Sequence, residues 1–139
     1  MNIDSINNGV VIDHITAGRG MKLYTLLRLD RLDVPVAIIT NAQSGKKGIK
    51  DIIKIDADID VDLDVIGFVD PGATVNIIRD GAVSEKKKMR LPHTLKNVLF
   101  CKNPKCITVT EQELDHIFTL TDESHRTYRC VYCETKANL

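Results

Sequence analysis

The sequence predicts an α+β fold that is divided into two parts. Short β-branched runs, one amphipathic segment and a hairpin turn fill the first ninety residues, which is typical of helices packed on one face of a mostly antiparallel sheet. All four cysteines lie after position 100, in the tight pairs CKNPKC and CVYC. We therefore expect an N-terminal domain over 1–91, a linker over 92–97 and a small C-terminal domain over 98–139.

The elements of the N-terminal part follow from its local patterns. A strand is predicted for GVVIDHI (9–15), and an amphipathic helix for GRGMKLYTLLRL (18–29), where apolar residues recur at helical spacing. VPVAIIT (34–40) predicts a second strand. The composition of NAQSGKKG (41–48) predicts a turn, and IKDIIKID (49–56) predicts a third strand.

The segment DADIDVDLDVIGFVDPG (56–72) is ambiguous. Its aspartates alternate with apolar residues at a period of two, which favours a strand, yet Ile59, Leu63 and Ile66 also lie at helical spacing. The pattern alone favours the strand. The next stretch, 73–91, predicts a hairpin that turns at Asp80-Gly81.

The four cysteines predict a metal site. Their spacing is C-x4-C, then 23 residues, then C-x2-C. Thiolates two to four residues apart can reach one tetrahedral ion, so two such turns supply four sulfur ligands. Iron accepts the same ligands, and we expect zinc. Two disulfides are the alternative; they need an oxidising compartment, and the N-terminus lacks the basic and apolar regions of a signal peptide. The ligands expected are Cys101, Cys106, Cys130 and Cys133.

A zinc site also explains how so short a C-terminal part folds. Residues 98–139 are too few to build a sufficient core alone, and a structural zinc site contributes about 10–16 kcal/mol of apparent binding energy. Strands at 116–120 and 126–131, joined by the turn TDES, complete a zinc-ribbon β domain. Four thiolates fill the coordination shell, so we expect a structural role, with His116 and His125 outside the ligand set.

Charge and composition restrict the partners. Residues 1–90 carry 13 basic and 13 acidic groups and residues 91–139 carry 6 of each, which together give the 19 and 19 of the whole chain. Aromatic residues make up only 4%. We expect no nucleic-acid partner, no membrane partner and a cytoplasmic location. A zinc-ribbon nucleic-acid-binding protein is the alternative, with EKKKMR (85–90) as its phosphate contact.

Candidate chemistry in the N-terminal part is diffuse. Lysines 50 and 54 share a face if 49–56 is a strand, and with Lys86 from a neighbouring strand they would form a cationic site for an oligophosphate. The alternative is a solvated charged face. Asp13-His14 is either an acid–base pair or an ordinary strand end, and neighbours on a strand point to opposite faces.

The chain resembles a known family, the regulatory chain of aspartate carbamoyltransferase. The residues that carry the resemblance are GVVIDHI, SGKKGIKDIIKI, GATVNII, NVLFCKNPKCI and YRCVYCE, in this order and at the family's spacing. It covers the chain from about Ile3 to Glu134. The cysteine pairs alone are not specific to the family, whereas their combination with VIDHI and KDIIKI is.

The resemblance implies a non-catalytic subunit of an enzyme of pyrimidine biosynthesis. It implies an N-terminal nucleotide-binding allosteric domain and a C-terminal zinc domain that contacts the catalytic chain. Regulatory dimers would bridge catalytic trimers, with CTP as inhibitor, ATP as activator and UTP assisting CTP. It also implies a helix at about 60–69, against the period-two pattern, and so two helices on one face of the sheet.

The resemblance further implies a nucleotide site. Asp13 would accept hydrogen bonds from ribose hydroxyls, His14 and Lys86 would meet the triphosphate, and Lys54 would lie near base and ribose. Backbone groups of Ser5 and Ile6 would contact the base edge, with Ile3 and Val83 as apolar contacts and Asn76 as a further site residue. Lys50 and Ser44 would receive a second, metal-bridged nucleotide.

Two further positions match the family where it faces the catalytic chain, and two others depart from the family's pattern. Asn103 and Glu134 match positions that face the catalytic chain. Gly81 stands where the family often has an aromatic residue near the base, and Lys105 replaces a small polar residue of the first cysteine pair. These departures bear on base contact and on one hydrogen bond to the catalytic chain.

Overall fold

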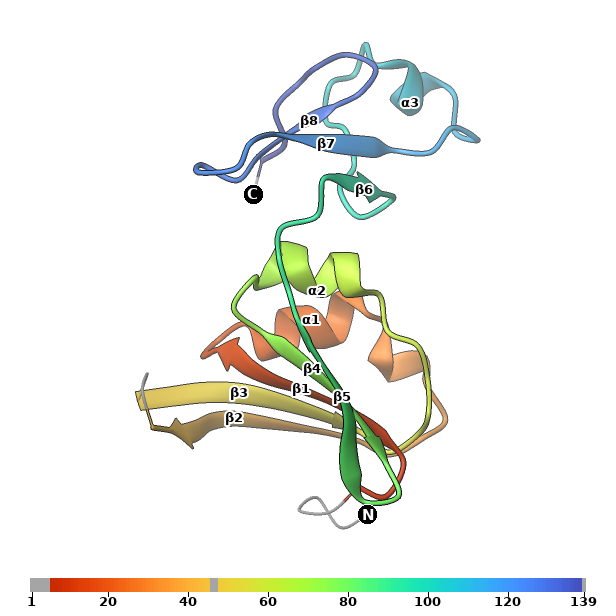
Figure 1. The fold of residues 1–139 in the computed structure, drawn as a ribbon. Coiled ribbons are helices and arrows are strands. Elements are labelled where there is room, and N and C mark those ends of the chain that lie inside the picture. Colours follow the sequence, from red (N-terminus) through yellow and green to blue (C-terminus); the bar gives the residue numbers. More distant parts are fainter. Residues whose placement is uncertain (1–5, 46–47, 139) are drawn as a thin grey trace. The chain divides into compact units, whose positions relative to one another are not determined.

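The computed structural model describes residues 6–45 and 48–138 and divides the chain between Arg90 and Leu91 into two compact units. The first unit is a five-stranded sheet with helices on one face, and the second contains a three-stranded sheet (Figure 1). The chain is thus a mixed α+β protein built on antiparallel sheets, as predicted. No helix in the described ranges is long and apolar enough to cross a membrane.

The sheet of the first unit is antiparallel throughout, with the strand order β2-β3-β1-β4-β5. The β4–β5 hairpin turns at Asp80 and Gly81, whose φ angles are 52° and 77°, as the sequence predicted. The strands are β1 Gly9–Thr16, β2 Val36–Ser44, β3 Gly48–Ile55, β4 Thr74–Arg79 and β5 Ala82–Lys88.

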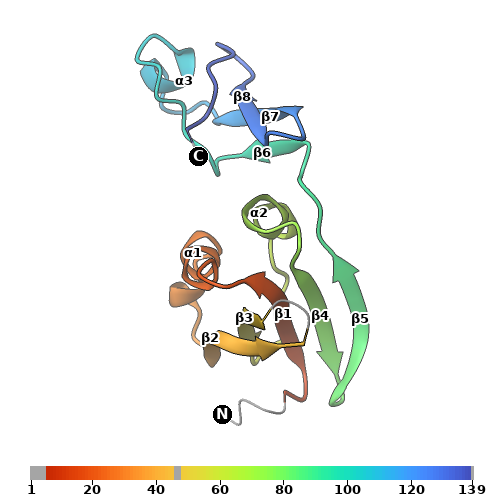
Figure 2. The same cartoon turned by 90° about the vertical axis from the view of Figure 1, so that its left-hand side faces the viewer.

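Two α-helices cover one face of this sheet, α1 Gly20–Leu26 and α2 Leu63–Val69 (Figures 1 and 2). Alternate residues of the central strands point to this face, and the core is formed there. Its fully buried side chains include Val10, Ile12, Ile53, Ile55, Val75, Leu23 and Ile66. The opposite face carries polar residues such as Lys54 and Asn76 together with apolar ones such as Val11, and it has no helix in the described part of the chain (Figure 2).

Helix α2 overturns the strand favoured by the alternating pattern and agrees with the resemblance. Asp62 is its N-cap, and its carboxylate accepts hydrogen bonds from the N–H groups of Asp64 at 3.0 Å and Val65 at 3.3 Å. The residues from Val65 to Val69 are all buried. The helical arrangement wins because it places this continuous apolar run against the core, which an alternating strand does not.

Other boundaries differ from the sequence prediction for local reasons. The predicted helix 18–29 ends early because Arg28 has a φ of 54°, after which Leu29–Arg31 forms a short 3₁₀ helix, η1. The predicted turn 41–48 is too long. Cross-strand pairing resumes after a bulge at Asn41, whose φ is 58°, so β2 continues to Ser44 and β3 begins at Gly48.

The second unit is a three-stranded antiparallel sheet with one short helix. Its elements are β6 Thr94–Lys96, β7 Ile117–Asp122, β8 Thr127–Cys130 and α3 Ile107–Thr110. The predicted strands at 116–120 and 126–131 thus lie close to β7 and β8. The segment 92–97, expected as the linker, contains β6, which pairs with β7, and the buried Tyr128 hydroxyl donates to the Pro92 carbonyl at 2.8 Å.

Candidate metal centre and open sheet face

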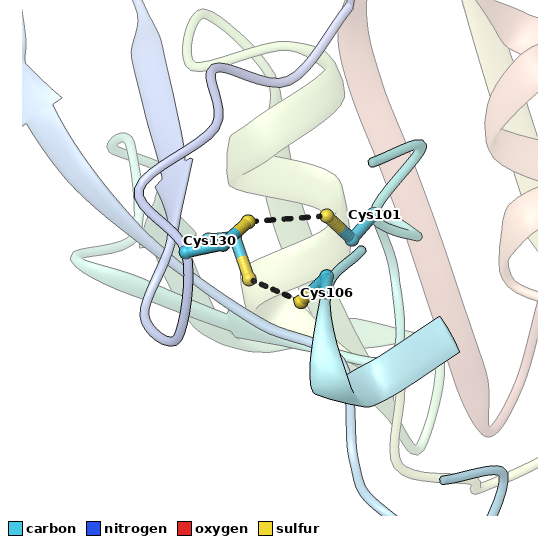
Figure 3. A group of neighbouring side chains, drawn as sticks. Cys101, Cys106 and Cys130 are labelled. Carbon is cyan, nitrogen blue, oxygen red and sulfur yellow. Dashed lines mark hydrogen bonds between the residues drawn. The ribbon is translucent and has the colours of Figure 1, made fainter. Parts of the chain in front are cut away.

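Four cysteine sulfurs come together in the second unit. Cys101 and Cys106 lie on the loop that leads into α3, Cys130 ends β8, and Cys133 follows it. The sulfurs all lie within 4.8 Å of one another, with 3.6 Å between Cys101 and Cys133 and 3.7 Å between Cys106 and Cys130. Figure 3 shows the thiols of Cys101, Cys106 and Cys130 pointing toward one another.

This arrangement fits a tetrahedral metal ion. Metal–sulfur bonds of about 2.3 Å place the sulfurs of an ideal tetrahedron about 3.8 Å apart, close to the two separations observed. None of the four cysteines forms a disulfide. The four cysteines that the sequence analysis grouped thus lie together, and their four sulfurs fit the ligand set of a closed tetrahedral site.

The environments of the four thiols differ. Burial raises the pKa of Cys101 to about 12, and burial also raises that of Cys130. A hydrogen bond with the Thr135 hydroxyl lowers the pKa of Cys133 to about 6, and one with the Thr108 hydroxyl lowers that of Cys106. Because metal binding requires thiolates, affinity for a metal falls as the pH falls.

The two nearby histidines lie outside the cluster, as the sequence predicted. His116 accepts a hydrogen bond from the Cys101 N–H at its Nδ1 atom, over 3.1 Å, and its ring packs edge-on against Phe100. His125 lies in the exposed β7–β8 turn, where Nδ1 is 2.8 Å from the Asp122 carboxylate. His116 thus supports the backbone of the first cysteine pair.

In the first unit, the open sheet face carries a row of residues that runs across four strands. Cross-strand pairing places Lys54 opposite Val11, Val11 opposite Asn76, and Asn76 opposite Lys86. Paired residues point to the same face, so two lysines flank an apolar residue and an amide. The Oδ1 atom of Asn76 is buried and has no hydrogen-bond partner in the described part of the chain.

A cavity of about 340 Å³ lies beside this row. It combines apolar walls with the Lys54 side chain, and Gly81 of the β4–β5 turn is part of its lining. The hydrogen bond from the Gly81 N–H to the Asn7 carbonyl, 2.9 Å long, fixes the turn against the segment before β1. Its lining residues are Ile6, Asn7, Val11, Lys54, Ile78, Gly81 and Val83.

A bulge in β1 organises the neighbouring part of the face. The pairing with β3 shifts between Ile12 and Ile15, and His14 takes a φ of 57°. Asp13 then forms an ion pair with Lys50 at 2.9 Å, while His14 Nδ1 lies 3.0 Å from the Thr74 hydroxyl. The bulge turns the two side chains toward different partners and does not join them as an acid–base pair.

The electrostatics of Asp13 favour its charged form. Burial by itself raises the pKa of Asp13, but the hydrogen bond from Lys50 and that from the His14 N–H outweigh it, and the pKa lies below its ordinary value. Asp13 is therefore an ionised acceptor on the open face at neutral pH.

Several expected site residues are not brought together. Lysines 50 and 54 share the open face, but Lys86 is not on a neighbouring strand, because β1 and β4 separate β5 from β3. Lys50 and Ser44 line a second cavity of about 320 Å³ that also includes His14. Ile3 and Ser5 lie outside the described residues.

Two buried aspartates that the sequence analysis did not single out support the region around the β1 bulge. Asp51 is 1% exposed, and its carboxylate accepts hydrogen bonds from the N–H groups of Gly18, Gly20 and Asn41 at 3.0, 3.0 and 3.1 Å. Asp70 is also buried and accepts from the Thr16 N–H. Only their burial on the helix side distinguishes them from the surrounding aspartates.

The two residues expected to face a catalytic chain, Asn103 and Glu134, differ in burial and in their hydrogen bonds. Asn103 is half-buried, and its side-chain oxygen accepts from the Lys105 N–H at 3.0 Å. Glu134 is exposed, has a φ of 63° and accepts the Arg129 guanidinium at its carbonyl, 3.1 Å away. Both lie next to the cysteine pairs, and the Lys105 side chain is not needed for the Asn103 turn because its backbone makes the contact.

Comparison with known proteins agrees with the division of the chain. The family model described as aspartate carbamoyltransferase regulatory chain, allosteric domain, matches residues 1–90. The model described as aspartate carbamoyltransferase regulatory chain, metal binding domain, matches residues 93–139. The chain belongs to the aspartate carbamoyltransferase regulatory chain family. It is a regulatory, non-catalytic chain whose second unit is a metal-binding domain that contains the cluster of four cysteines.

Individual aspartate carbamoyltransferase regulatory chains are similar over nearly their whole length. That of Clostridium botulinum is 48% identical over 134 residues, which cover 96% of this chain and 92% of the relative. That of Clostridium acetobutylicum is 47% identical over the same shares. That of Bifidobacterium longum is 43% identical over 139 residues and the full length of both.

Proposed function

We propose that this chain binds the nucleotides CTP and ATP on the open face of its first unit and controls the catalytic chain of aspartate carbamoyltransferase, which its zinc-loaded second unit contacts. The observation that carries the proposal is the row Lys54–Val11–Asn76–Lys86 beside an apolar-walled cavity. It offers cations for phosphates and an apolar surface for a base on one continuous face.

The chemistry of the face matches the parts of a nucleoside triphosphate. The cavity beside Gly81 receives the base against Ile6 and Val83, and Lys54 lies at its edge. The ionised Asp13 accepts hydrogen bonds from ribose hydroxyls. His14, in the β1 bulge, and Lys86, on β5, meet the phosphates.

The unpartnered Asn76 oxygen supports a ligand at this place. A buried acceptor without a hydrogen bond costs free energy, so such atoms are paired in most proteins by protein groups, water or ligand. Asn76 lies between Val11 and Lys86 in the row. A nucleotide that spans the row supplies a donor to this oxygen.

UTP, which carries the same ribose and triphosphate, is expected to occupy the second cavity beside Lys50 and Ser44.

Zinc is the metal proposed for the second unit, and its role is structural. The four thiolates close the shell and leave no position for a reacting water. The zinc site holds together the loops that carry Asn103 and Glu134, which are proposed to contact the catalytic chain.

Regulation then requires CTP and ATP to bind two states of the assembly with different affinities, because equal affinity shifts no equilibrium. A dimer of this chain is the proposed regulatory unit of that assembly.

Calorimetric titration of the zinc-loaded chain with CTP and with ATP tests the proposal. Saturable binding is expected for the intact chain, and Lys86→Ala is expected to weaken it at least tenfold because a phosphate contact is lost. Lys87→Ala is the matched control: it removes the same charge from the same strand, but Lys87 pairs with the core residue Val75 and points to the other face. Equal loss in both variants, or no binding by the intact chain, contradicts the proposed site.

A further inference from the structure

A threonine follows the second cysteine of each pair by two residues. Thr108 follows Cys106, and Thr135 follows Cys133. The Thr108 hydroxyl lies 3.0 Å from the Cys106 sulfur, and the Thr135 hydroxyl lies 3.1 Å from the Cys133 sulfur. The two pairs differ in spacing and in the elements around them, yet each presents a hydroxyl to one sulfur.

The direction of these hydrogen bonds follows from the chemistry of the site. As a neutral thiol, Cys133 donates to the Thr135 oxygen, whereas between Cys106 and Thr108 either atom can be the donor. A metal-bound thiolate has no proton, so at both places the hydroxyl then has to be the donor. At Thr135 a further contact agrees with this direction, since the Asn103 amide nitrogen donates to the hydroxyl oxygen over a long 3.5 Å. At Thr108 the side chain is 2% exposed, so water does not compete for the hydroxyl.

The other two sulfurs differ in this respect. In the described part of the chain, the Cys101 sulfur contacts that of Cys133 and the Cys130 sulfur contacts that of Cys106, and neither lies beside a hydroxyl. The two pairs therefore share one arrangement, in which the second cysteine of each is the one beside a threonine hydroxyl.

We propose that Thr108 and Thr135 are positioning residues of the metal centre, each donating its hydroxyl hydrogen bond to one metal-bound thiolate and thereby strengthening metal retention. Four thiolates around a divalent cation leave a net charge of −2, which donors around the sulfurs stabilise. Partners of metal ligands typically contribute tenfold to a hundredfold to metal affinity. This inference rests on the proposed zinc site and extends it to residues that do not touch the metal.

The test uses the full chain and a competition for zinc against a chromophoric chelator. Thr108→Val and Thr135→Val keep the side-chain shape and remove the hydroxyl, and each is expected to weaken zinc binding about 10–100-fold. Thr108→Ser and Thr135→Ser keep the hydroxyl and are expected to retain most of the affinity. Thr110→Val is the matched control, because its hydroxyl lies on the same helix and bonds to the Ile107 carbonyl at 3.2 Å.

A spectroscopic readout separates hydrogen bonding from simple structural damage. With Co²⁺ in place of zinc, the sulfur-to-metal charge-transfer band of the valine variants is expected at lower energy, because a thiolate without its hydrogen bond gives up an electron more easily. The serine variants and Thr110→Val are expected to keep the wild-type band. If Thr108→Val does not fold with saturating zinc, Thr135→Val decides the question, because Thr135 is only half-buried.

The outcomes distinguish the two proposals. If the wild-type chain takes up no stoichiometric zinc, the proposed metal site itself is wrong and this inference falls with it. If the wild-type chain binds zinc but the valine variants match it in affinity and in the Co²⁺ spectrum, only the inference is wrong. Serine variants as weak as the valine variants, or an equal loss in Thr110→Val, also overturn it.

Discussion

At the scale of single residues, the fold of the first unit depends on the carboxylate of Asp51, which lies on the helix side of the sheet and not on the open face. Asp51 lies next to Lys50 on β3 but points to the opposite side of the sheet, where it binds three backbone N–H groups. These donors belong to the start of α1 and to the bulge in β2. One buried side chain thus joins three segments, and the neighbouring Lys50 joins β3 to β1 on the open face.

We expect Asp51→Asn to lower the free energy of unfolding of the first unit by about 1–3 kcal/mol. An amide presents one nitrogen with hydrogens where a carboxylate oxygen accepted, so at least one buried N–H loses its partner. Urea denaturation followed by circular dichroism measures the loss. Asp58→Asn, at an exposed position, is the control, and equal stability of the two variants would show that the hydrogen bonds to Asp51 contribute little.

The pH dependence of the open face follows from Asp13. Its folded pKa is lower than that of the unfolded chain, so its ion pair with Lys50 stabilises the fold above pH about 4 and this contribution is lost as the pH falls through the folded value. Lys50→Met is expected to raise the pKa of Asp13, because burial remains and the ammonium is gone. A ¹³C NMR titration of the Asp13 carboxyl measures this, with the exposed Lys22→Met as control. An unchanged Asp13 pKa in Lys50→Met would disprove the assigned cause.

At the scale of elements, α2 is shaped by a close backbone approach. A Cβ atom on Gly67 would lie 2.2 Å from the Arg90 carbonyl oxygen, so the helix surface has to be bare where the end of the first unit passes over it. The segment that passes over the helix is also held by a hydrogen bond from the Met89 N–H to the Ala73 carbonyl, 3.3 Å long. Gly67 therefore has a packing role inside a helix, where glycine is otherwise unfavourable.

Gly67→Ala tests this role because helix propensity and packing predict opposite results. Propensity alone predicts a gain of about 1 kcal/mol, whereas the contact with backbone predicts a loss of about 1–3 kcal/mol. We expect the loss, measured by urea denaturation. Gly45→Ala is the control, since a Cβ there meets nothing within 4 Å. A stabilised Gly67→Ala variant would mean that the Arg90 segment moves aside without cost.

At the scale of the whole molecule, the fold of each unit is stabilised in a different way. The first has a buried core between sheet and helices, with Ile12, Ile53 and Val75 fully enclosed. The second, over 91–138, combines a three-stranded sheet, the short helix α3 and the cysteine cluster, and its buried side chains Leu95, Phe118 and Tyr128 form a smaller core. A domain of this size rarely folds without a metal or disulfides.

We therefore expect metal removal to unfold one unit only. A strong chelator should abolish amide-exchange protection in β6, β7 and β8, leave β1–β5 protected, and be reversed by added zinc. The effect should strengthen as the pH falls, because protons compete with the metal for the thiolates. Hydrogen exchange read by mass spectrometry checks this. Protection of β7 and β8 that survives complete metal removal would show that the sheet is stable by itself.

The sequence by itself determined the features that depend on short-range patterns. Cysteine spacing predicted the whole metal cluster, because ligands in tight turns are placed by their neighbours in the chain. The Asp80-Gly81 turn and the main strands followed from local propensity in the same way. The family resemblance, carried by motifs spread over the chain, predicted α2 where the alternating pattern failed.

Only the tertiary structure decided what depends on contacts between distant segments. It separated Lys86 from Lys54 by two strands, because strand order is set by long-range pairing that no local pattern records. It buried Asp51 and Asp70 and left similar aspartates exposed, since burial depends on which helix covers each position. It placed α2 by packing the run from Val65 to Val69 into the core, an energy that appears only once the sheet beneath it exists.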